Sequence, residues 1–126
     1  MNDETFLDAA EGGDLKSIKE LLNDGIDVNT KDNHKRTALM KAAKYGHKQI
    51  VKLLVEQGAD IDYRDNRGTS ALYWASTNGH YDIVQFLIEH SVDVDVHDDR
   101  GWSAKDQAIT HHHENVVELL NAAGAH

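Results

Sequence analysis

The stretch ALMKAAKYGH at residues 38–47 returns 33 residues later as ALYWASTNGH at residues 71–80. Comparison of the chain with itself at this offset finds thirteen identical positions between the two units that contain these stretches. The same offset also matches apolar, small and glycine residues toward both ends of the sequence. Self-similarity at a fixed period is typical of repeat proteins, so we expect a single domain that spans the chain. The predicted units are 1–31, 32–64, 65–97 and 98–126.

Each unit carries the signals of two short helices. Thr37, Ser70 and Ser103 precede alanine-led stretches, where a side-chain oxygen can accept hydrogen bonds from the free N–H groups of a first helical turn. Gly46 and Gly79 follow these stretches and indicate helix ends. An apolar stripe with helical spacing comes next in each unit. The predicted helices of the two central units are 38–45, 48–57, 71–78 and 81–90.

This pattern resembles the ankyrin repeat. The family pattern is a D-x-x-G turn, then T-P-L-H-x-A-A-x-x-G-H, I-V-x-x-L-L and G-A-D-V-N. Here it stands as DNHKRTALMKAAKYGHKQIVKLLVEQGADID and DNRGTSALYWASTNGHYDIVQFLIEHSVDVD. The resemblance covers essentially the whole chain. It implies an all-α-dominated repeat solenoid, a stack of helix-turn-helix units with connecting β-hairpins.

Several positions depart from the family pattern. Lys35 stands where Gly68 and Gly101 stand, so the family pattern does not predict the geometry of the first hairpin turn. In the last unit, Lys105 falls at an apolar position and His112 falls at a glycine position. The end units of a solenoid have one face in water, so polar residues are favoured there. We therefore expect 1–31 and 98–126 to act as N-capping and C-capping units of a complete protein that begins at Met1.

The composition disfavours several classes of partner. The formal net charge is −9, from 22 acidic and 13 basic residues, which opposes binding to nucleic acid and to anionic lipid. No apolar run approaches the length of a membrane span. The chain has no cysteine, which fits a reducing compartment. We expect a cytoplasmic monomer that has no cofactor and no bound metal.

The histidines raise the question of a metal or catalytic site. The run His111, His112 and His113 is the obvious candidate, but consecutive helical residues point about 100° apart and do not converge on one ion. The resemblance assigns His47 and His80 a structural role. No nucleophile motif, phosphate-binding loop or carboxylate pair indicates an enzyme. The alternative to protein binding is a small-molecule-responsive or metal-responsive protein that uses residues 111–113 with Asp106.

The variable positions of the repeat predict where a partner binds. The resemblance implies a concave side, made of hairpin tips and the exposed face of each first helix, that binds another protein as a scaffold or an inhibitor. Trp, Tyr and Arg dominate the energetics of interfaces, and the variable positions on this concave side are rich in these three residue types. The predicted partner-binding residues are Asn33, His34, Arg36, Lys44, Tyr45, Tyr63, Arg64, Asn66, Arg67, Trp74, Thr77, Asn78, His97, Arg100, Trp102 and His111.

The formal charge changes along the hairpin tips. Residues 27–37 carry three bases and two acids, residues 60–69 carry two bases and three acids, and residues 93–102 carry one base and four acids. The net charges are therefore +1, −1 and −3. A partner of the opposite polarity is favoured, because complementary charge steers association.

Overall fold

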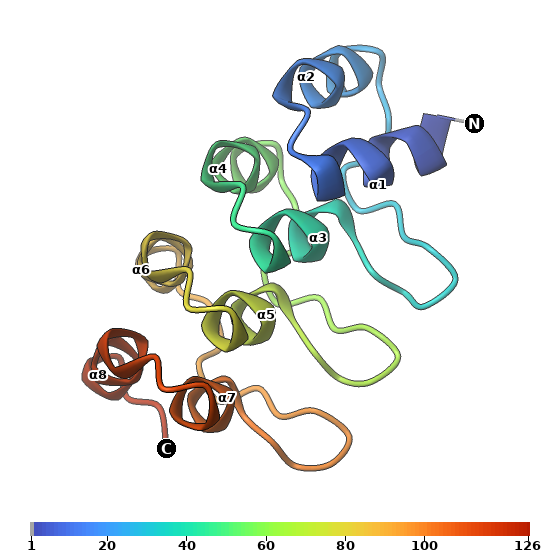
Figure 1. Ribbon diagram of the computed structural model, residues 1–126. Coiled ribbons are helices and arrows are strands. Elements are labelled where there is room, and N and C mark those ends of the chain that lie inside the picture. The colour runs from blue at the N-terminus through green and yellow to red at the C-terminus, as the bar shows by residue number, and fades with distance from the viewer. Residues whose placement is uncertain (1) are drawn as a thin grey trace.

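The computed structural model describes residues 2–126, so Met1 lies outside the described residues. Within this range the chain folds into eight helices that form four consecutive pairs (Figure 1). The helices are α1 (Asn2–Gly12), α2 (Leu15–Asn23), α3 (Ala38–Lys44), α4 (Lys48–Glu56), α5 (Ala71–Thr77), α6 (Tyr81–Glu89), α7 (Ala104–Thr110) and α8 (Glu114–Ala122). None of them is long and apolar enough to cross a membrane.

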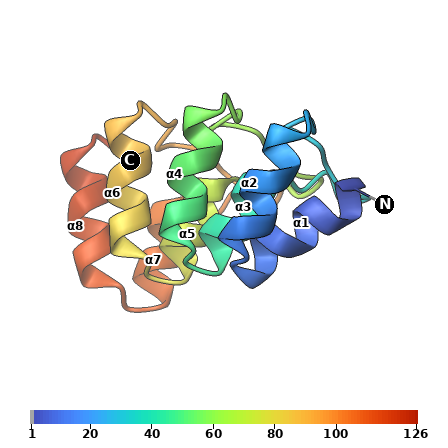
Figure 2. The same ribbon diagram turned by 90° about the horizontal axis from the view of Figure 1, so that it is seen from above.

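The pairs stack side by side in two layers of helices (Figure 1). The first helices α1, α3, α5 and α7 contact one another in order, and the second helices α2, α4, α6 and α8 do the same. Viewed from above, the stack runs from the N-terminus at one end to α8 at the other (Figure 2). The loops that connect successive pairs extend from the layer of first helices, away from the second helices (Figure 1). The predicted repeat solenoid is confirmed.

The predicted helix starts of the two central units are confirmed, and each predicted end is one residue late. The hydroxyl groups of Thr37, Ser70 and Ser103 accept from backbone N–H groups three residues later, as expected for N-caps. The last predicted residue of each helix serves instead as the C-cap. Tyr45, for example, has a φ of −96° and a ψ of 4°, outside the helical range.

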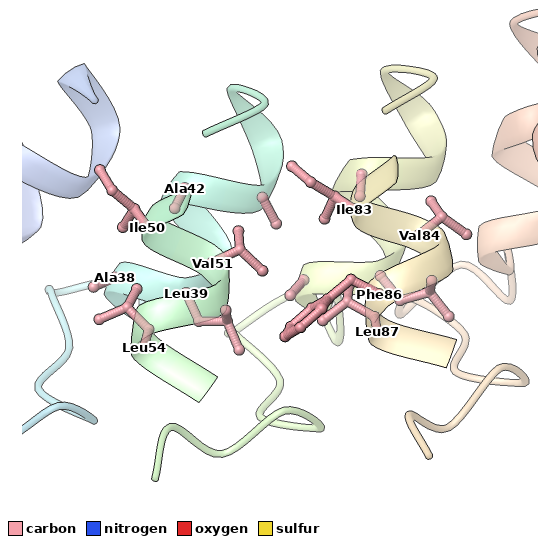
Figure 3. Close-up of a cluster of buried hydrophobic side chains, with 14 of the residues drawn as sticks. Ala38, Leu39, Ala42, Ile50, Val51, Leu54, Ile83, Val84, Phe86 and Leu87 are labelled. Atoms are coloured by element: carbon pink, nitrogen blue, oxygen red, sulfur yellow. The ribbon is translucent and has the colours of Figure 1, made fainter. Parts of the chain in front are cut away.

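The core lies between the layers, where the repeated apolar positions meet (Figure 3). Leu39 of α3 is 1% exposed, and Val51 and Leu54 of α4 are fully buried. Ala42 and Ala75 are also fully buried, and their small side chains let neighbouring first helices approach closely. The apolar and small residues that are identical between the repeats are therefore the ones that build the stack.

The connecting loops contain hardly any β-structure. The backbone forms isolated antiparallel bridges between Lys31 and Thr37 and between His97 and Ser103, and no longer strand occurs in residues 2–126. The predicted β-hairpins are therefore loops that turn back on themselves without a pair of regular strands. Lys35 adopts a φ of 61°, close to the 79° of Gly68, so the first loop makes the same turn without a glycine. A left-handed conformation at lysine carries a strain of about 1–2 kcal/mol.

Successive units are tied together by side chains that bond across the stack. The carboxylate of Asp62 accepts the N–H of Asp93 at 2.8 Å, and the carboxylate of Asp95 accepts the N–H of His126 at 2.9 Å. Both bonds join equivalent positions of neighbouring units. The carboxylates of Asp62 and Asp95 therefore help to fix the spacing of the second halves of the loops.

Candidate partner-binding surface

The loops and the adjoining first helices form one continuous surface, called the loop surface below. It comprises loop residues 31–37, 63–70 and 97–103, the sides of α3, α5 and α7 next to them, and Tyr45 at the C-cap of α3. An aspartate at the start of each loop organises its turn. In Asp65, one carboxylate oxygen accepts the N–H groups of Arg67 and Thr69, each at 2.9 Å. Asp32 and Asp98 accept from the residues two and four positions later in the same way.

Two of the four arginines predicted to bind a partner are held by the protein itself. The Nε of Arg36 donates to the buried carboxylate of Asp65 at 3.2 Å. The guanidinium of Arg64 donates to the carbonyl oxygens of Gly68 and His97. The bonds from Arg36 to Asp65 and from Arg64 to His97 join neighbouring loops, so these arginines stiffen the loop surface.

The other two arginines are free to meet a partner. Within residues 2–126, the guanidinium groups of Arg67 and Arg100 form no hydrogen bond and no ion pair. Both line a cavity of about 170 Å³ that is also lined by Trp74, Trp102, Asp98 and Asp99. This part of the loop surface therefore combines two guanidinium groups that make no hydrogen bond with aromatic and acidic side chains.

The predicted aromatic residues differ in exposure. Tyr45 and Trp102 are each 48% exposed. Tyr63 is half-buried, and the Nζ of Lys31 lies 5.4 Å from the centre of its ring. Trp74 is also half-buried, and its indole N–H donates to the hydroxyl of Thr69 at 2.8 Å. All four lie on loops or first helices, and two of them offer broad apolar surface.

The predicted polar residues of the loops are accessible. Asn33, His34, Asn66 and His97 are all exposed. The loops also bond to each other through the backbone, since the N–H of Asn66 donates to the carbonyl of His34 at 3.0 Å. The loop surface is therefore a connected array whose tip side chains point outward.

Thr77 is a correction to the sequence-based expectation. The residue is only 8% exposed, and its hydroxyl donates to the carbonyl of Tyr73 at 2.8 Å. The reason is that α5 packs between α3 and α7, which covers this position. Asn78 and His111 are exposed, but Asn78 donates to the carbonyl of Lys44 and His111 donates to the carbonyl of Gln107.

The histidine run has a structural member that the sequence analysis did not separate from its neighbours. The Nε2 of His113 donates to the carbonyl of Thr77 at 3.0 Å. His80 makes the same bond one unit earlier, to the carbonyl of Lys44, and His47 makes it two units earlier, to the carbonyl of Glu11. His113 is therefore the third member of a row of histidines that join each unit to the one before it.

The remaining residues of the alternative site are not gathered around a common point. Asp106 accepts the N–H of Ser103 at 2.9 Å and forms a capping box at the start of α7. The rings of His111 and His113 lie parallel, with their centres 6.2 Å apart. No group of three or more metal-ligating residues in 2–126 could hold a metal ion.

Asp98 is the most strongly bonded carboxylate on the C-terminal part of the loop surface. Its loss of hydration acts to raise the pKa of the carboxyl, but hydrogen bonds from the Tyr73 hydroxyl and from the N–H groups of Trp102 and Arg100 lower the pKa on balance. The bond from Tyr73 is 2.7 Å long. Burial and this carboxylate in turn raise the pKa of Tyr73 above its ordinary range. The pair joins α5 to the third loop.

We expect the unfolding free energy to fall as the pH is lowered below about 4. The pKa of Asp98 is lower in the folded state than in the unfolded chain, so its contribution is present above the unfolded pKa. That contribution is lost as the pH falls through the folded pKa. The same holds for Asp32, whose pKa is lowered by hydrogen bonds that outweigh its loss of hydration. Urea unfolding between neutral and acidic pH measures the effect.

The control for this prediction is Asp98→Asn, which cannot titrate. The variant should be less stable than the wild type at pH 7 and should lose less stability on acidification. An equal loss in both proteins would show that Asp98 does not contribute to the acid sensitivity.

The fold and the loop surface define a class: a helical repeat solenoid whose connecting loops and first helices form an extended surface. A sequence model of ankyrin repeats, spanning three copies, matches residues 6–98 and 64–126. The chain belongs to the ankyrin repeat family. No curated protein matches it in sequence. Ankyrin repeats are generally protein–protein interaction modules.

Proposed function

We propose that this protein is a non-catalytic module that binds one partner protein through the loop surface and acts as a scaffold or an inhibitor. A solenoid offers a large, rigid surface rather than a small closed pocket, which suits a protein partner. We expect it to act as a monomer and in the cytoplasm.

The exposure of two large aromatic side chains carries this proposal. Tyr45, Trp102 and Ile109 are the exposed large hydrophobic side chains of residues 2–126, and the first two lie on the loop surface. Trp102 shares a cavity with the unpaired guanidinium groups of Arg67 and Arg100. Aromatic residues and arginines of this kind are the usual anchors of interfaces. The repeated positions of the same helices, in contrast, are buried in the stack.

The charge of the loops favours a partner whose charge has the opposite polarity. The first loop has a net charge of +1, and the third has a net charge of −3. A partner that presents acidic residues to the first loop and basic residues to the third would gain in rate of association and in selectivity.

We expect Trp102→Ala, Tyr63→Ala and Arg67→Ala each to weaken partner binding by about 1 kcal/mol or more, as is usual for interface anchors. The partner is first isolated from the source cell by pull-down and identified by mass spectrometry, and its affinity is then measured by calorimetry. The unfolding free energy should change by no more than about 0.5 kcal/mol, because the three side chains contribute little to the core.

The matched controls are Lys52→Ala and Glu56→Ala on α4, in the layer of second helices. Neither should change the affinity. If these two variants abolish binding and the three loop-surface variants do not, the binding site lies on the second helices and the proposal is wrong.

A further inference from the structure

Lys44 is the last residue of α3, and its ammonium group lies between two aromatic rings. The Nζ atom is 4.6 Å from the centre of the Trp74 ring and 5.3 Å from the centre of the Tyr45 ring. A cation over an aromatic face is attracted by the ring. The backbone at Lys44 is also fixed, because its carbonyl accepts from the side chains of Asn78 and His80. The ammonium group is therefore held in one place on the loop surface.

Lys44 differs from the other cations around it in having no acidic partner. It lines a shallow hollow together with Arg36 and Lys41. Arg36 is paired with Asp65 at 3.2 Å, and Lys41 is paired with Asp32 at 3.2 Å. Lys41 also lies 3.6 Å from Glu11, the acidic residue of the hollow. Among residues 2–126, no carboxylate forms an ion pair with Lys44.

Most Lys and Arg side chains in residues 2–126 form no ion pair, but among them only Lys44 has its charge over two aromatic rings. An ammonium group has three N–H donors, and ring faces satisfy them less well than a carboxylate does. The half-buried position of Lys44 also reduces the screening of its charge by water. The hollow thus presents one fixed, unpaired positive charge with aromatic walls.

We propose that Lys44 is the anchor for a carboxylate side chain of the partner protein. This inference rests on the proposed function and adds the chemistry that the loop surface recognises near α3. The partner's Asp or Glu pairs with the Nζ of Lys44, and its methylene groups contact the rings of Tyr45 and Trp74. Because the lysine is already held by these rings, little side-chain freedom is lost when the pair forms.

A carboxylate fits this site better than a phosphate chain. A single strand of nucleic acid could also use a cation beside aromatic rings. It would, however, bring many phosphates to a surface whose second and third loops are acidic. A single acidic side chain would contact only the hollow around Lys44 and not the acidic second and third loops.

The test uses a display library of random dodecapeptides selected against the intact protein. The recovered sequences should share an Asp or a Glu. A synthetic peptide with the most frequent recovered sequence should lose affinity when that acid is replaced by its amide. It should bind about fivefold more weakly to Lys44→Met than to the wild type, as for a partly buried ion pair. Added salt should weaken the wild-type complex more than the Lys44→Met complex.

Two variants serve as controls. Lys44→Arg keeps the charge and should retain most of the affinity, while Lys52→Met on α4 makes the same change of net charge and should have no effect. Circular dichroism of each variant checks that it is folded. Equal affinity of the peptide for the wild type and for Lys44→Met overturns the inference, as does recovery of peptides without a shared acid or binding of oligothymidylate in place of peptides.

The result also separates this inference from the proposed function. Peptides that depend on Tyr63 and Trp102 but not on Lys44 would keep the loop surface as the binding site and reject the lysine anchor. Peptides whose affinity is unchanged by replacement of Tyr63, Trp102 or Lys44 would reject both the proposed function and the lysine anchor. A library that yields no binder would do the same.

Discussion

Replacing Gly79 by alanine should lower the unfolding free energy by about 3 kcal/mol, although it adds only one methyl group. Gly79 has a φ of +70°, which costs an alanine about 1–2 kcal/mol. A β-carbon there would also lie 2.5 Å from the Nδ1 of His113. The ring of His113 must then move and lose its bond to the carbonyl of Thr77, at a further cost of about 1 kcal/mol. Urea unfolding measures the loss.

Gly58→Ala is the matched control for this prediction. Gly58 has a φ of +92°, but a β-carbon there would meet no atom within 4 Å. Its replacement should therefore cost only the backbone strain of about 1–2 kcal/mol. In a His113→Ala background, Gly79→Ala should become no more costly than Gly58→Ala, since the colliding ring is absent. Equal effects of the two glycine substitutions in the wild-type background would contradict the close packing of Gly79 and His113.

Asp65→Ala should also destabilise the protein by about 3 kcal/mol, the usual cost of breaking a buried charged network. Asp65 is 7% exposed and serves four donors. One oxygen accepts two backbone N–H groups, and the other accepts the hydroxyl of Thr69 at 2.7 Å and the Nε of Arg36 at 3.2 Å. Alanine leaves these donors without their acceptor. Each donor that stays buried without a hydrogen bond lowers the unfolding free energy of the protein.

Two further variants test the cause of this loss. Asp65→Asn keeps the oxygen that faces the backbone but not the second acceptor, so it should fall between the wild type and Asp65→Ala. Asp99→Ala, at an exposed neighbouring aspartate in the third loop, should change stability by no more than about 0.5 kcal/mol. A small effect of Asp65→Ala in urea unfolding would mean that the loops do not depend on this carboxylate.

The helices could be predicted from the sequence because the repeat marks them directly. The apolar positions recur with helical spacing, and a threonine or serine precedes each of the three later first helices. The role of His113 was harder to see, because His112 replaces the glycine that precedes His47 and His80. His112 adopts a φ of 61°, so the backbone keeps the turn that the glycine makes elsewhere. The 33-residue offset from His80 leads directly to His113, whereas the Gly-His pair is absent at this position.

The loop surface could be predicted only in part. The offset identifies which positions vary, but a variable position is not always an exposed one. Thr77 varies and is buried, since α5 has a neighbour on each side. The sequence also gives no way to separate Arg36 and Arg64 from the unpaired arginines. Their partners lie in the next loop of the stack, and those contacts depend on side-chain geometry that does not repeat.

The most direct test of this account is to map the partner's contact surface by NMR chemical shifts of the backbone amides and of the two tryptophan indoles. On addition of the isolated partner protein, we expect the largest changes in residues 64–70 and 97–103 and at the indole N–H of Trp102. The amides of α4 and α6, in the layer of second helices, should change little. Large changes confined to α4 and α6, with the loops and Trp102 unaffected, would contradict the claim that the variable positions of this repeat form the binding surface.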